Sequence, residues 1–107
     1  MKTVHKFEVP IGEKAVSLRL SSSAKVRMVE YITCAKSIFM WVEVPADEVL
    51  QNNGLKRLFR VFPTGSGIPA GATFMGSAVD QYHPEAYHLY EITDCIASHE
   101  NNKDMRD

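Results

Sequence analysis

The fold is decided by one short stretch, Ile38-Phe39-Met40-Trp41-Val42-Glu43-Val44, which Pro45 closes. Apolar side chains occupy both its odd and its even positions, which is typical of a central strand that is covered on both faces. Pro45 ends the strand because proline has no N–H to donate to a sheet. The apolar run is far too short to span a bilayer, so we expect no membrane insertion.

The segments on either side of this stretch alternate between apolar and polar residues with a period of two. The clearest example is Val16, Leu18 and Leu20 alternating with Ser17 and Arg19. Further strands are predicted over residues 3–9, 25–33, 55–62, 73–82 and 86–92. The sequence therefore predicts an all-β fold, a compact antiparallel sandwich or barrel of about seven short strands, with at most one short helical turn over residues 46–50.

The alternation also predicts which side chains share a face. In residues 25–33 it places Val26 and Met28 on one face and Val29 and Tyr31 on the other. Within residues 55–62, one face carries Arg57, Phe59 and Val61. The opposite face carries Leu58, Arg60 and Phe62. Asn53-Gly54, between the strand over residues 38–44 and the strand over residues 55–62, predicts a hairpin that joins them.

Composition limits the kind of protein this is. The chain has 107 residues, enough for one domain, which we assign to residues 1–95 with a polar, flexible tail over 96–107. Lys and Arg total 12 and Asp and Glu total 13, giving a net charge of −1 that argues against non-specific nucleic acid binding. The N-terminus lacks the apolar core of a signal peptide, so we expect a cytoplasmic protein.

Neither the cysteines nor the histidines form a chemical motif. Cys34 and Cys95 lie far apart and belong to no C-x-x-C pair, so they are interpreted as reduced, buried thiols. The four histidines lack the spacing of metal ligands, and no nucleophile motif is present. We therefore expect no metal, no cofactor and no enzymatic activity.

The candidate binding residues lie in two loops and on three other elements. The glycine loop Thr64-Gly65-Ser66-Gly67 is interpreted as a tight connection in which Gly65, Gly67 and Gly71 adopt positive φ, with a small anion-binding nest as the alternative. Arg57 and Arg60 point to opposite faces of their strand and are interpreted as solvated, with a paired anion contact by one of them as the alternative. The remaining candidates are Tyr82, Tyr87, Asp47 and Glu48.

The pattern of the whole chain resembles a family of small uncharacterised bacteriophage proteins. The resemblance rests on His5-Lys6-Phe7-Glu8-Val9-Pro10-Ile11, Met40-Trp41-Val42, Arg60-Val61, Phe74-Met75-Gly76-Ser77 and His88-Leu89-Tyr90-Glu91, and it covers residues 3–92. It implies a phage origin and a site of action in the cytoplasm of an infected bacterium. It implies no catalytic residue.

Three hypotheses about function follow. The first is a non-enzymatic phage accessory protein that binds and inhibits a host protein complex, such as an anti-CRISPR or other anti-defence inhibitor. The second is a binder of a nucleotide immune signal, which would use the glycine loop, Arg57 or Arg60, and a stacked aromatic ring. The third is a minor virion or assembly protein. Homo-oligomers are expected as well, because small sheets with open edges tend to pair.

Overall fold

The structure is a computed structural model that describes residues 1–46 and 54–92. Within these residues it confirms the all-β prediction, with seven antiparallel strands in two sheets and no helix. The strands are β1 (Lys2–Val9), β2 (Val16–Leu20), β3 (Lys25–Ile32), β4 (Ser37–Pro45), β5 (Leu55–Pro63), β6 (Thr73–Asp80) and β7 (Glu85–Ile92). No helix in the described part of the chain is long and apolar enough to cross a membrane.

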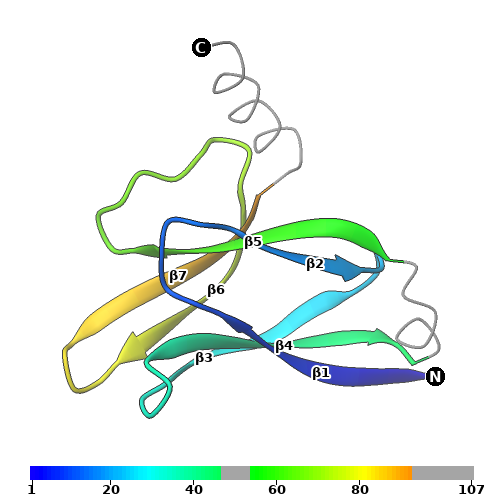
Figure 1. Ribbon diagram of the computed structural model, residues 1–107, viewed down its shortest axis with the longest axis horizontal. Coiled ribbons are helices and arrows are strands. Elements are labelled where there is room, and N and C mark those ends of the chain that lie inside the picture. The colour runs from blue at the N-terminus through cyan, green and yellow to red at the C-terminus, as the bar shows by residue number, and fades with distance from the viewer. Residues whose placement is uncertain (47–53, 93–107) are drawn as a thin grey trace.

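The seven strands form a three-stranded sheet in the order β1-β4-β3 and a four-stranded sheet in the order β2-β5-β7-β6 (Figure 1). Only β3–β4 and β6–β7 are sequential pairs within one sheet. Because β4 and β5 belong to different sheets, Asn53-Gly54 does not close a hairpin between them, and that prediction was wrong. The helical turn predicted over residues 46–50 and the tail from residue 96 lie almost wholly outside the described residues.

The hydrophobic core lies between the two sheets. Alternate residues of β4 point into it, as do Phe59 and Val61 of β5, whereas Leu58 and Phe62 are buried on the other face of β5 in a second cluster with Ile92. Phe59, Met40 and Leu89 are completely buried between the sheets. Burying one such side chain contributes about 2–3 kcal/mol, and this shared core holds the two sheets together.

Strand β4 is central to its sheet but is covered on only one face. Its even residues are buried, whereas Phe39, Trp41 and Glu43 on the odd positions are half-exposed. The prediction that both faces are covered was therefore wrong. The second sheet packs on one side only, so the outer apolar residues of β4 are left on the surface.

A β-bulge in β3 corrects a second prediction. The register with β4 shifts between Val26 and Met28, so Val26 lies opposite Val42 and Met28 lies opposite Trp41. The extra residue returns Val26 to the core side, with Val29, and leaves Met28 on the outer face. Simple alternation had placed Val26 and Met28 together.

Two predictions about loop residues are also wrong. Gly65 has a φ of 95°, but Gly67 and Gly71 do not share its positive φ. Cys34 is a free thiol exposed in the β3–β4 turn, not a buried one. Short connections on the surface leave little apolar material to cover a side chain. Cys95 lies outside the described residues.

Candidate binding faces

Arg57 is a structural clamp between three parts of the fold. Its Nε and Nη2 donate to the two carboxylate oxygens of Glu91, each at 2.8 Å. Its Nη1 donates to the carbonyl oxygens of Ser21 and Ala24, both at 2.9 Å. These bonds join β5 to β7 and to the β2–β3 turn. Ligand binding by Arg57 stays a prediction, but these donors are already engaged within the protein.

Arg60 points to the outer side of the four-stranded sheet, opposite Arg57 as predicted. Its guanidinium carbon lies 4.5 Å from the ring centroid of Phe62, which is completely buried. The strand register places Arg60, Tyr90 and Phe74 in one row across β5, β7 and β6. We call this surface the arginine face. It consists of Arg60, Phe62, Phe74, His88 and Tyr90.

His88 on this face is held between two hydroxyl groups. Its Nε2 lies 2.9 Å from Thr64 Oγ1, and its Nδ1 lies 2.7 Å from Ser77 Oγ. The Thr64 hydroxyl also donates to the carbonyl oxygen of Ala86, at 3.2 Å. Because its proton is used there, Thr64 Oγ1 accepts a hydrogen bond from His88 Nε2–H. In the neutral ring, Nδ1 then accepts from the Ser77 hydroxyl.

The glycine loop begins with a tight turn beside His88. The Ser66 N–H donates to the carbonyl oxygen of Pro63 at 3.1 Å, and Gly65 occupies the third position of the turn, where a type II turn requires positive φ. The Thr64 N–H donates to the Ala86 carbonyl oxygen. Two of the backbone donors that a nest would need are therefore used internally, which favours the connection over the nest.

The two predicted tyrosines lie in different environments. Tyr82 is 76% exposed in the β6–β7 turn, where its N–H donates to Asp80 Oδ1. Tyr87 points between the sheets and stacks on Tyr31, with ring centroids 5.9 Å apart. Burial raises the pKa of Tyr31, and the negative charge of Asp80 raises it further. The structure therefore does not bring Tyr82 and Tyr87 together. Asp47 and Glu48 lie outside the described residues.

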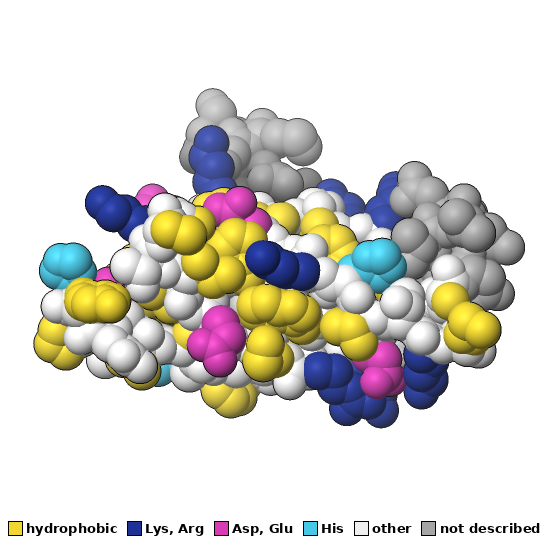
Figure 2. All heavy atoms as spheres, turned by 90° about the horizontal axis from the view of Figure 1, so that it is seen from below, with side chains coloured by type: hydrophobic (Ala, Val, Ile, Leu, Met, Phe, Trp, Pro, Cys, Tyr) yellow, Lys and Arg dark blue, Asp and Glu magenta, His cyan; other side chains and the backbone are white. Residues whose placement is uncertain are grey.

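Sequence reasoning missed the outer face of the three-stranded sheet. Phe39 and Trp41 point outward from its central strand, and Lys6 Nζ lies 4.8 Å and 5.7 Å from their ring centroids. Val4 and Met28 flank the rings and are 52% and 45% exposed. We call these five residues the aromatic face. Figure 2 shows hydrophobic side chains gathered in the middle of this side of the molecule, with charged side chains among them.

Ionic contacts occupy one border of the aromatic face. Glu43 pairs with Lys2 at 3.4 Å and with Arg27 at 3.2 Å. The hydrogen bond from Arg27 lowers the pKa of Glu43, partial burial opposes this, and Lys2 adds to the lowering. Two cations therefore share one carboxylate on this border, which carries a net positive charge.

The opposite border carries unmatched negative charge. Glu8 and Glu30 lie on either side of Phe39 in the strand register. Within the described residues neither forms an ion pair. A ring flanked by two carboxylates is suited to a cationic group.

Comparison of the sequence with known protein families places the chain in one of them. Residues 1–98 match the family described as a domain of unknown function, DUF7352. The chain belongs to this family. No curated protein and no solved structure matches the chain. The predicted likeness to an uncharacterised family is thus confirmed at this level, and phage origin stays a prediction.

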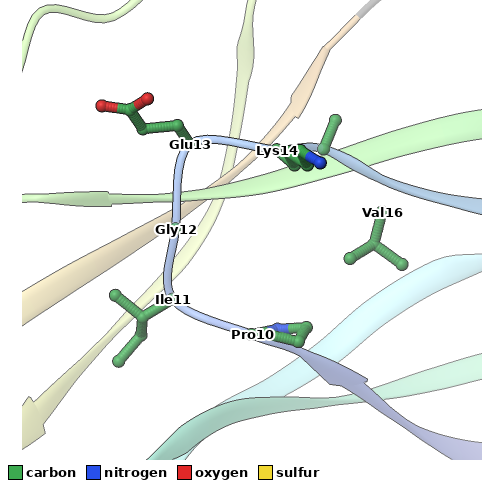
Figure 3. A pocket seen from close by; sticks show the side chains of 7 residues that line it. Pro10, Ile11, Gly12, Glu13, Lys14 and Val16 are labelled. Carbon is green, nitrogen blue, oxygen red and sulfur yellow. The ribbon is translucent and has the colours of Figure 1, made fainter.

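The described part of the DUF7352 domain also has a hollow inside the β1–β2 loop, lined by residues 10–16 (Figure 3). The Glu13 carboxylate and the Lys14 side chain extend in different directions from it, so its polar groups do not converge on one point. Residues 1–46 and 54–92 contain no group of three His, Cys, Asp or Glu side chains that could hold a metal ion. The two outer faces remain the better candidates.

Proposed function

We propose that this DUF7352 domain is a non-enzymatic protein-binding domain that uses the aromatic face as its contact surface. The observation that carries the proposal is that Phe39 and Trp41 point outward from a central strand. The outer positions of an antiparallel sheet are normally polar, because water covers that side. Aromatic side chains at the centre of a patch with charges at its border are typical of protein interfaces.

The charges around the rings indicate what kind of partner fits. Glu8 and Glu30 flank Phe39 and form no ion pair within residues 1–46 and 54–92, whereas Glu43 on the opposite border is paired with Lys2 and Arg27. Lys6 Nζ already lies over Phe39 and Trp41, which shows that these rings accept a cation. We infer that the partner presents an apolar centre with an arginine or lysine at its edge.

A finer form of the proposal concerns the identity of the partner. We propose a host protein complex in the cytoplasm of a bacterium, which the domain inhibits as a phage-encoded anti-defence factor. The support for this step is the sequence resemblance over residues 3–92 together with the small size of the domain. Inhibition by occupying a surface needs only one well-formed face.

The proposal is tested by affinity capture with amine cross-linking, using the tagged chain as bait in lysate of the bacterium that carries the gene. The Phe39→Ser/Trp41→Ser variant is compared with Phe74→Ser, which removes an exposed ring from the other sheet. Circular dichroism confirms that each variant is folded. We expect a partner that the wild type and Phe74→Ser capture, that the double variant loses, and that cross-links to Lys6.

Capture that survives in the double variant would contradict the proposal, as would the absence of any partner that depends on this face. The predicted charge preference is tested separately by Glu8→Lys/Glu30→Lys. This variant keeps the rings and reverses the two unmatched charges, so it should weaken capture. An increase would show that the partner is acidic.

A further inference from the structure

Arg60 differs from the other described arginines in having no acceptor. Arg19 donates to the Gly54 carbonyl oxygen, Arg27 pairs with Glu43, and Arg57 pairs with Glu91. Within residues 1–46 and 54–92, Arg60 has only its contact with the Phe62 ring, and its Nε is buried without a hydrogen-bond partner. The hydration that the buried Nε loses is not replaced by any described residue, and water or a ligand must supply the acceptors for the rest of this half-buried guanidinium.

The surroundings of Arg60 have one sign of charge. The described outward positions of the four-stranded sheet carry the cations Arg19, Lys56 and Arg60, and none of these positions is acidic. Asp80, Glu85 and Glu91 all lie at inward-facing register positions. The loop over residues 64–72, which rises on this side of the sheet in Figure 1, contains no charged residue. Among the residues that the structure describes, this arrangement attracts an anion and places no carboxylate beside Arg60.

An exposed ring lies in the same row as the cation. Phe74 is 56% exposed, and its ring contacts Tyr90 in a tilted edge arrangement with centroids 5.4 Å apart. Arg60, Tyr90 and Phe74 are consecutive across three strands. Two strand intervals of about 4.8 Å therefore place the backbone positions of Arg60 and Phe74 roughly 10 Å apart. This is the order of distance that separates the phosphate from the base in a mononucleotide.

From this row we infer that the arginine face binds a mononucleotide, with the phosphate on the Arg60 guanidinium and the base on Phe74. A guanidinium recognises phosphate through paired hydrogen bonds, and aromatic rings stack on bases. Arg60, the one arginine without an acceptor in residues 1–46 and 54–92, fits one phosphate, and the net charge of −1 disfavours a long polyanion. This site is independent of the aromatic face on the other sheet.

The inference is tested by calorimetric and NMR titration of the whole chain with four probes: adenosine monophosphate, adenosine, inorganic phosphate and acetate. The variants are Arg60→Gln and Phe74→Ser, with Arg27→Gln as the matched control on the other sheet. We expect the wild type and Arg27→Gln to bind the monophosphate more tightly than any other probe. Arg60→Gln should weaken that binding about tenfold or more, and Phe74→Ser should weaken it while leaving phosphate binding unchanged.

Several results would overturn the inference. One is the absence of saturable binding of the monophosphate at millimolar concentrations. A second is equal binding by Arg60→Gln and wild type, and a third is acetate binding as tightly as the monophosphate. Arg60→Lys protects the test against misfolding, because it keeps the charge and the packed stem but loses the planar fork. Its affinity should fall between those of wild type and Arg60→Gln.

Discussion

Replacing Arg57 with alanine should destabilise the domain more than any other single loss of charge in the described residues. The substitution removes two bonds to Glu91 and two to the carbonyl oxygens of Ser21 and Ala24. A hydrogen bond to a charged group contributes about 1.5–3 kcal/mol, but the four bonds share one side chain and are not additive. The pair keeps 14% and 22% exposure, so water replaces part of the loss. We expect a decrease of about 3 kcal/mol in the free energy of unfolding.

The measurement is urea denaturation followed by circular dichroism. Arg27→Ala is the matched control, because Arg27 also pairs with a glutamate but its side chain is 51% exposed. An exposed pair contributes less than about 1 kcal/mol. Glu91→Gln should fall between the two, since the amide oxygen still accepts one bond. If Arg57→Ala lowers the unfolding free energy no more than Arg27→Ala does, the clamp is solvated and the reasoning fails.

Two further predictions concern the region around β6. Burial raises the pKa of Asp80, but hydrogen bonds from the N–H of Tyr82 and from His83 outweigh it, so the pKa is lowered. The stability that this carboxylate contributes is therefore present above its unfolded pKa and is lost as pH falls through the folded pKa. In acid unfolding, Asp80→Asn should show a flatter dependence of stability on pH than wild type below about pH 4. Gly76→Ala should lower the free energy of unfolding by about 1–3 kcal/mol, because the new Cβ would lie 2.6 Å from Val29 Cγ2. Thermal unfolding should show part of that stability restored in the Val29→Ala/Gly76→Ala double variant, which removes the clashing methyl group.

The strands were predictable where each residue alternates without interruption. In β2 the period of two identified both the strand and the side facing the core, and in β5 it identified the strand and the opposition of Arg57 and Arg60. The bulge in β3 was not predictable in this way, because a bulge adds a residue without changing the composition of the segment. The sequence of β3 fits a pairing with β4 both with and without a bulge, so the register depends on the contacts with β4.

The candidate faces were harder to predict than the fold. In β4 both sets of alternating residues are apolar, and the sequence contains no signal for which set a second sheet covers. The signal that could have found the aromatic face is Lys6, which occupies the polar face of β1. The strand register, which alternation does not specify, places Lys6 opposite Trp41.

Lys6 also explains how an aromatic strand centre persists on the surface. Its ammonium group lies over Phe39 and Trp41 while the side chain stays exposed, so the rings are partly covered and the charge remains in water. A covering of this kind can move aside when a partner arrives, which a packed sheet cannot do. The arginine face uses the reverse arrangement, in which the ring of Phe62 is buried and Arg60 lies over it with its Nε unsatisfied. One face therefore exposes ring surface that a partner can cover, and the other holds a cation that an anion can satisfy. Their ligands should be different in kind, and neither proposal depends on the other.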